Sequence, residues 1–181
     1  MKLAFKICIV GDPGVGKTSL ILRYIENKFK ENYIPTLGVE FLTKKINVGK
    51  EAIETNLIIW DIGGQHKWQT KLHLYLQGAD GAIIIYDITR RSTFQNLENW
   101  VTNIKKIAGE VPYLFVGNKK DLENERNVPT EEAIAFSKSK DNYPVLEASA
   151  KTGATVNEMF HKIAENIIIH KAKKQAHLWK D

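Results

Sequence analysis

Short apolar runs alternate with segments of helical spacing along the whole chain. Five of the runs are apolar on both faces, a pattern typical of strands in a parallel sheet that helices cover on both sides; they are residues 3–10, 57–60, 82–86, 113–116 and 145–146. Residues 39–48 are more mixed and end at Gly49 and Lys50, which predicts an edge strand that turns back into residues 53–60.

The segments between the runs predict helices. Two of them repeat apolar residues at intervals of three and four, which lines one helix face: Phe94, Leu97, Val101 and Ile104 in the first, Val156, Phe160, Ile163 and Ile167 in the second. Thr130 precedes two glutamates, which predicts a helix start because acidic side chains favour the positive end of the helix dipole. The expected fold is three-layer α/β, with a mostly parallel six-stranded sheet, one antiparallel edge strand and helices on both faces.

Composition and charge agree with a single globular domain. The chain has 181 residues, with neither a repeat nor a linker to divide it. Its net charge of +5 is diffuse, without the basic and aromatic stripe that indicates nucleic-acid binding. Cys8 is the only cysteine, so we expect a buried thiol and a reducing, cytoplasmic setting. No apolar run approaches the roughly 18 residues that span a bilayer.

A glycine-rich segment directly follows the first apolar run. Residues 11–18 match the pattern G-x-x-x-x-G-K-[ST], and a helical pattern follows them. The backbone N–H groups of such a loop and of the next helix bind phosphate. A chance glycine-rich turn is the simpler alternative, which the strand before and the helix after disfavour. The loop alone does not separate GTP from ATP. The residues expected to bind nucleotide here are Gly14, Val15, Gly16, Lys17, Thr18 and Ser19.

Two polar motifs follow later apolar runs, at what should be the carboxyl ends of strands. They are the stretch of residues 118–121, Asn-Lys-Lys-Asp, and residues 149–151, Ser-Ala-Lys. Both therefore fall on the rim that carries the phosphate loop. These motifs make the chain similar to the Ras superfamily, whose N-K-x-D and S-A-K elements recognise guanine. A polar turn remains the alternative for residues 118–121 taken in isolation.

The chemistry of guanine explains these motifs. A carboxylate at Asp121 can accept both the N1–H and the 2-amino group of guanine, neither of which adenine offers. The resemblance implies that the Ala150 N–H faces guanine O6 and that Asn118 braces the loops. It places Lys119 along the base and sugar, and it assigns Ser149 and Lys151 to the nucleotide site as well. The Lys17 ammonium would reach the β- and γ-phosphates, and the Thr18 hydroxyl would ligate Mg²⁺.

The resemblance covers residues 3 to about 170 and includes two nucleotide-sensing loops. Phe29 corresponds to an aromatic ring that lies against guanine, although core packing is an alternative. Residues 33–36 resemble the first switch, which contributes Tyr33 to the nucleotide site and in which Thr36 binds Mg²⁺ and reads the γ-phosphate. Common turn chemistry is the alternative for Thr36, which follows Pro35.

Residues 61–65 resemble the second switch. The resemblance implies that Asp61 holds Mg²⁺ through water, that the Gly64 N–H contacts the γ-phosphate, and that Gln65 orients the attacking water. Gln65 is otherwise read as a solvated residue at the start of a helix. The expected catalytic residues are therefore Gln65, Lys17 and Thr36, and the expected metal ligands are Thr18, Thr36 and Asp61.

Within the superfamily the chain is most similar to the Rab branch. Residues 38–41, Gly-Val-Glu-Phe, together with Trp60 and Tyr75, match that branch. Phe41, Trp60 and Tyr75 occupy its effector-facing aromatic positions, and core packing is the alternative for each ring.

Three features depart from the Ras and Rab pattern. Gly63 replaces the usual alanine and gives the Asp-x-Gly-Gly-Gln form of Arf proteins, which predicts a looser second switch. Pro13 has no N–H and should hinder an activating protein whose arginine must pass its ring. The end of the chain offers no cysteine for prenylation, so we expect no prenyl anchor on it.

The resemblance implies a P-loop G domain in residues 1–170, followed by a basic helix end or tail in residues 171–181. As a small GTPase it would be a monomeric molecular switch that binds GTP or GDP with Mg²⁺ and hydrolyses GTP to GDP. It would regulate trafficking or signalling through effector, exchange-factor and GTPase-activating proteins, with no nucleic-acid partner and with peripheral membrane contact left open. No arginine is visible as an internal finger, so we expect a rate on the order of 10⁻⁴ to 10⁻³ per second.

Two alternatives stay open on the sequence. The first is a module that holds guanine nucleotide without hydrolysing it, which Gln65 disfavours and which Pro13 and Gly63 leave open. The second is a nucleoside kinase or ATPase with the same loop, which conflicts with residues 118–121.

Overall fold

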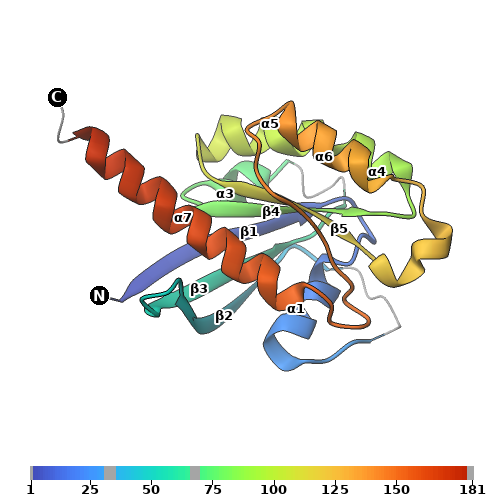
Figure 1. Ribbon diagram of the computed structural model, residues 1–181, viewed down its shortest axis with the longest axis horizontal. Helices are drawn as coiled ribbons and strands as arrows, with labels where there is room; N and C mark the ends of the chain where they lie inside the picture. Colours follow the sequence, from blue (N-terminus) through green and yellow to red (C-terminus); the bar gives the residue numbers. More distant parts are fainter. Residues whose placement is uncertain (1, 31–35, 66–69, 179–181) are drawn as a thin grey trace.

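The computed structural model describes residues 2–30, 36–65 and 70–178, and in these residues a six-stranded sheet forms the centre of the molecule. Its strand order is β2-β3-β1-β4-β5-β6 (Figure 1). β2 pairs antiparallel with β3, and the other neighbouring pairs are parallel. The predicted fold class is therefore confirmed. The strands are β1 Leu3–Gly11, β2 Val39–Val48, β3 Ile53–Ile62, β4 Gly81–Asp87, β5 Tyr113–Asn118 and β6 Val145–Glu147.

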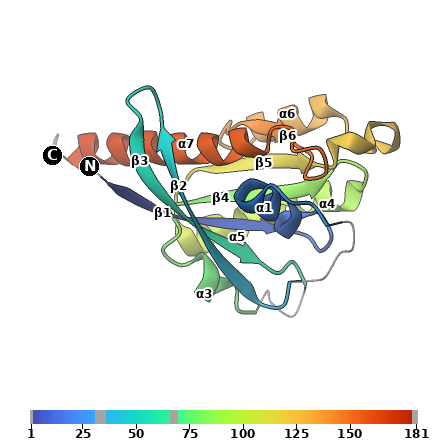
Figure 2. The same cartoon turned by 90° about the horizontal axis from the view of Figure 1, so that it is seen from below.

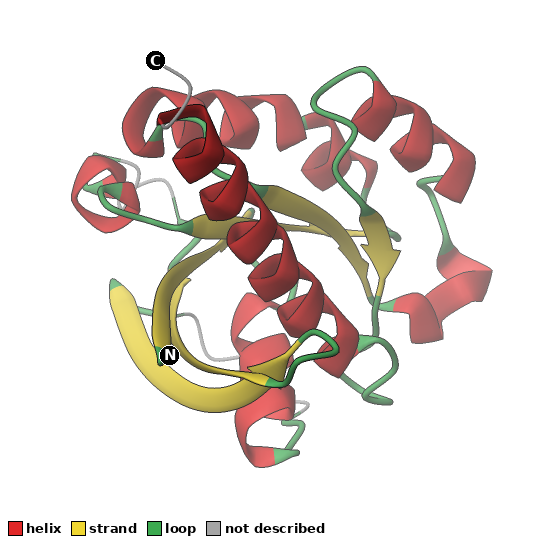
Figure 3. Cartoon of the chain, turned by 60° about the vertical axis from the view of Figure 1, so that its left-hand side comes forward, coloured by secondary structure: helices red, strands yellow, loops and turns green. Residues whose placement is uncertain are grey.

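Helices cover both faces of this sheet, as the red and yellow elements of Figure 3 show. α1 and α7 pack on one face, while α3, α4, α5 and α6 pack on the other, so that α3 and α7 lie on opposite sides in Figure 2. The helices are α1 Lys17–Glu26, α3 Leu72–Leu76, α4 Arg91–Gln95, α5 Leu97–Ala108, the 3₁₀ helix η1 Lys120–Glu125, α6 Thr130–Lys138 and α7 Val156–Leu178.

The two cores follow from the alternation of side chains along a strand. In β1, Ile7 and Ile9 join the core under α1 and α7, whereas Cys8 and Val10 join the core under α3 to α6. Cys8 is buried, as expected from the sequence, and burial raises the pKa of its thiol to about 12.

One helix boundary differs from the sequence pattern. The apolar face from Phe94 to Ile104 is divided between α4 and α5, because Asn96 ends the first and precedes the second. α7 continues as far as Leu178. α6 begins at Thr130 as predicted. No helix in the described ranges combines the length and the apolar character that crossing a membrane requires.

The parallel strands place their carboxyl ends on one rim. β1 ends at Gly11, β4 at Asp87, β5 at Asn118 and β6 at Glu147. Ligands of open α/β sheets bind at such a rim, and the loops that follow these strands carry most of the predicted site residues.

Candidate nucleotide-binding site

The phosphate loop connects β1 to α1 and encloses a buried lysine. The Lys17 Nζ donates hydrogen bonds to the carbonyl oxygens of Gly11 at 2.8 Å and Asp12 at 2.9 Å. Burial lowers the Lys17 pKa to about 8, against the raising influence of the Asp61 and Asp12 carboxylates. A phosphate bound in this loop would restore the favourable environment of the ammonium, because an anion nearby stabilises the charged form.

One amide side chain joins three loops of the rim. The Asn118 Nδ2 at the end of β5 donates to the carbonyl oxygen of Val15 at 2.8 Å, and its Oδ1 accepts from the Ala150 N–H at 3.2 Å. Gly16 has φ +96°, and a Cβ on it would lie 2.2 Å from the Asn118 Nδ2. Glycine is therefore required there both by conformation and by space. Asn118 therefore connects the phosphate loop with the loop that carries Ala150.

A carboxylate is held in position at the base end of the site. The Ser149 Oγ donates to the Asp121 Oδ1 at 2.5 Å and accepts from the Thr152 N–H at 3.1 Å. This chain of hydrogen bonds orients Asp121, whose side chain is otherwise exposed. A carboxylate oriented in this way can accept two parallel N–H groups from a planar ligand.

Asn118 and Asp121 line one cleft of about 350 Å³, a size within the range of small-molecule sites. Lys30 and Leu122 also line the cleft, and neither belongs to a predicted site motif. Leu122 directly follows Asp121, and Lys30 directly follows Phe29, so adjacency to a motif residue was the available signal. The predicted residues that line the cleft are Gly14, Gly16, Ser19, Phe29, Asn118, Lys119, Asp121, Ala150 and Lys151.

The three expected metal ligands lie together. The Thr18 hydroxyl donates to the Asp61 Oδ2 at 2.5 Å and lies 2.6 Å from the Thr36 hydroxyl oxygen. The Asp61 Oδ1 is buried and has no hydrogen-bond partner within the described part of the chain. Burial raises the Asp61 pKa, with the Thr18 hydrogen bond and the Lys17 charge acting in the opposite direction. An all-oxygen set with an unpaired carboxylate oxygen fits a hard cation such as Mg²⁺.

The second switch lies against the phosphate loop. A Cβ on Gly64 would lie 2.6 Å from the Gly11 carbonyl oxygen and 2.7 Å from the Lys17 Nζ. Gln65 lines a small hollow together with Lys17, Thr36 and Gly64, so the three expected catalytic residues border one space. Tyr33, which was assigned to the nucleotide site, lies outside the described residues.

Two of the expected effector-facing rings, Phe41 and Trp60, lie on the paired strands β2 and β3, and Tyr75 lies on α3. Phe41 is 57% exposed and packs edge-to-face on Trp60, with ring centroids 4.4 Å apart. Trp60 and Tyr75 are half-buried and pack against the core under α3 to α6. The exposure of Phe41 disfavours the alternative of plain core packing for that ring.

Comparison with known proteins agrees with this geometry. The model of the Ras family matches residues 6–169. The chain belongs to the Ras family of small GTPases. It is 41% identical to Ras-related protein Rab-21 of Bos taurus over 166 residues, which is 91% of this chain and 73% of that protein. It is also 40% identical to Rab-17 of Mus musculus, over 90% of this chain and 75% of that protein, and 41% identical to Rab-2B of Dictyostelium discoideum, over 91% and 80%. This small GTPase is therefore a Rab-like GTP-binding protein and a hydrolase of GTP.

Proposed function

We propose that this small GTPase is a molecular switch that binds GTP or GDP together with Mg²⁺ and changes its surface when GTP is hydrolysed. The observation that carries the proposal is the meeting of Thr18, Thr36 and Asp61 at one point. These residues come from the phosphate loop and the two switch segments. A cation and a γ-phosphate bound there would contact both switches, and their loss would release both.

The nucleotide would be held at two ends. Asp121 recognises the guanine edge, with the Ala150 N–H, Ser149 and Lys151 beside it, while Phe29 and Lys119 flank the base. At the other end, Lys17 and the backbone N–H groups of the loop hold the phosphates. Thr18, Thr36 and Asp61 would hold Mg²⁺, which would neutralise phosphate charge when bound.

Hydrolysis is an in-line attack by water on the γ-phosphorus. The new oxygen–phosphorus bond forms as the bond to the β–γ bridging oxygen breaks, and the products are GDP and inorganic phosphate. Gln65 orients the water, and Lys17 stabilises the charge that develops on the phosphate oxygens. The described residues offer no candidate for an arginine finger, so a rate on the order of 10⁻⁴ to 10⁻³ per second is expected.

The Rab names of the relatives and the exposure of Phe41 support a role in trafficking or signalling through effector proteins. Exchange factors and GTPase-activating proteins would control the two states of a monomer formed by residues 1–170. The basic residues after 170 would allow peripheral contact with an anionic membrane surface. Gly63 would make the second switch looser than in a protein with alanine there.

A chromatographic time course tests the proposal. Protein loaded with GTP and Mg²⁺ is sampled over hours, and a sample incubated with ATP runs beside it. GDP accumulating on the protein, with no ATP retained, is the expected result. GTP that stays intact would refute hydrolysis and leave a module that works by exchange alone. Retained ATP would refute the base assignment.

A further inference from the structure

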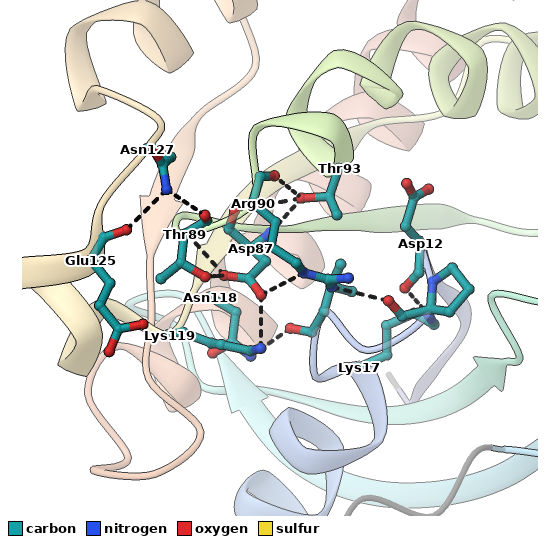
Figure 4. A network of polar contacts seen from close by, with 12 residues as sticks. Asp12, Lys17, Asp87, Thr89, Arg90, Thr93, Asn118, Lys119, Glu125 and Asn127 are labelled. Atoms are coloured by element: carbon teal, nitrogen blue, oxygen red, sulfur yellow. Dashed lines mark hydrogen bonds and ion pairs between the residues drawn. The ribbon is translucent and has the colours of Figure 1, made fainter.

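A buried carboxylate at the end of β4 lies between two cations of the rim. The Asp87 side chain is fully buried, and its Oδ2 lies 2.7 Å from the Lys119 Nζ and 2.9 Å from the Arg90 Nε (Figure 4). The Thr89 N–H and hydroxyl donate to its Oδ1 at 2.9 and 2.7 Å. Burial alone would raise the Asp87 pKa, but the hydrogen bonds from Lys119, Thr89 and Arg90 outweigh it and lower the pKa. Asp87 is therefore a fixed anion.

Arg90 extends this anchor to the phosphate loop. Its Nη2 donates to the Pro13 carbonyl oxygen at 3.0 Å, while its Nε holds Asp87. Figure 4 shows the guanidinium between the Asp87 carboxylate and the loop. A Cβ on Gly14 would lie 3.6 Å from the Arg90 Nη2, so the cation lies beside the Pro13–Gly14 peptide.

A second residue of the loop, Asp12, is fixed as well. The Asp12 Oδ1 accepts hydrogen bonds from the Asn96 Nδ2 at 2.6 Å and from the Trp100 Nε1 at 2.9 Å. Pro13 has no N–H, so the peptide between Asp12 and Pro13 offers no donor to a phosphate. The neighbouring Gly14 N–H is therefore the next backbone donor that a phosphate could use at this point of the loop.

The contact with Arg90 acts on that N–H through one peptide group. No cis peptide occurs in the described ranges, so the Gly14 N–H points away from the side on which Arg90 binds the Pro13 carbonyl. Hydrogen bonds in series polarise one another, and a bond from a charged donor does so more strongly. Gly14 borders both the cleft that Asp121 lines and the small hollow that Lys17 and Gln65 line.

We propose that Arg90, held by Asp87, is a positioning residue for the nucleotide phosphates: it fixes and polarises the Pro13–Gly14 peptide and thereby slows the release of GDP and GTP. The inference rests on the proposed function, since it concerns the same nucleotide. The contact of Arg90 with the Pro13 carbonyl compensates for the N–H donor that proline lacks. Asp87 also binds Lys119, so this one carboxylate connects the phosphate loop, through Arg90, to the segment of residues 118–121 that is assigned to guanine.

The test compares Arg90→Ala with Arg91→Ala. Arg91 is the next residue and is similarly exposed, but its Nη2 pairs with the Glu132 carboxylate of α6 at 2.6 Å, away from the loop. Release of a fluorescent GDP is measured in excess Mg²⁺ and unlabelled GDP, and GDP and GMP then compete for the site. Arg90→Ala should release GDP about tenfold faster, as expected for the loss of a charged hydrogen bond. Arg91→Ala should stay within about twofold of the wild type.

The GMP competition separates a role at the phosphates from a general structural one. The α-phosphate of GMP depends less on the Gly14 region, so Arg90→Ala should weaken GDP binding about tenfold while GMP binding changes less than about twofold. Equal weakening of both nucleotides, or GDP release as slow as in Arg91→Ala, would overturn the inference.

Arg90→Lys provides a second comparison and serves if the alanine variant does not fold. Lysine keeps the charge but lacks the planar fork that reaches Asp87 and Pro13 together, so GDP release should also accelerate. A lysine variant that releases GDP at the wild-type rate would overturn the inference. A wild-type protein that retains no GDP would refute the proposed function itself, whereas tight GDP binding with an unaffected Arg90→Ala refutes only the inference.

Discussion

A methyl group added at Gly16 should break the contacts by which Asn118 joins three loops. The Cβ of Gly16→Ala would lie 2.2 Å from the Asn118 Nδ2, far inside van der Waals contact, so the amide must move. Its hydrogen bonds to the Val15 carbonyl and from the Ala150 N–H are then lost. Each buried group left unpaired costs about 2 kcal/mol, and alanine at a positive φ costs about 1 kcal/mol more. We expect the free energy of unfolding to fall by about 5 kcal/mol, a large part of the stability of a domain.

A double-mutant cycle with Asn118→Ala shows whether the effect passes through the amide. Asn118→Ala loses the same two hydrogen bonds, about 4 kcal/mol by the same reasoning, but leaves room for the methyl group at position 16. Adding Gly16→Ala in that background should therefore cost only the backbone term of about 1 kcal/mol. Unfolding in urea, at one fixed excess of GDP and Mg²⁺, measures all four proteins, because bound nucleotide contributes to apparent stability.

Gly78→Ala isolates the backbone term. Gly78 has φ +70°, and a Cβ on it meets nothing within 4 Å, so about 1 kcal/mol is expected. The reasoning is refuted if Gly16→Ala costs as much in the Asn118→Ala background as in the wild type. Additivity within about 0.5 kcal/mol is the criterion, since it indicates independent sites.

Three further changes test the base site, the catalytic assignment and an acid-sensitive contact. Gln65→Leu should keep GTP binding and slow single-turnover hydrolysis at least several-fold, and an unchanged rate would remove Gln65 from the mechanism. Asp121→Asn should weaken GTP binding and shift preference toward xanthosine triphosphate, whose base carries a carbonyl at position 2; unaltered GTP affinity would contradict the base assignment. Burial raises the Glu147 pKa, but hydrogen bonds from Arg126 and Thr130 outweigh it and hold the pKa below the usual 4.5. A lowered carboxyl pKa contributes stability above pH 4.5 that is lost as the pH falls through the lower folded value. Glu147→Gln should therefore unfold more easily at pH 7, by about 2 kcal/mol, and approach the wild type in acid; a constant difference from pH 7 to acid would contradict this account.

The layers of this fold and the rim on which the site lies could be predicted from the amino-acid sequence alone. Apolar runs and helical spacings are local properties, because the side chains of one strand or helix meet the core at fixed intervals. The residues of the phosphate loop and of 118–121 and 149–151 each follow such a run. Parallel strands end on the same edge of a sheet. Motifs that follow such strands were therefore expected to meet around one cleft.

The contacts between these residues could not be predicted from the sequence, because they depend on how the strands are arranged in space. The pairing of Arg90 with Pro13 spans 77 positions and that of Asn118 with Val15 spans 103. Both depend on β1 and β5 lying on either side of β4 in the sheet. The predicted helix is divided at Asn96, which also makes a long-range contact: its side-chain amide donates to the Asp12 carboxylate of the phosphate loop. Hydrophobic periodicity carries no information about such contacts, because they are made by polar side chains that the order and register of the strands bring together.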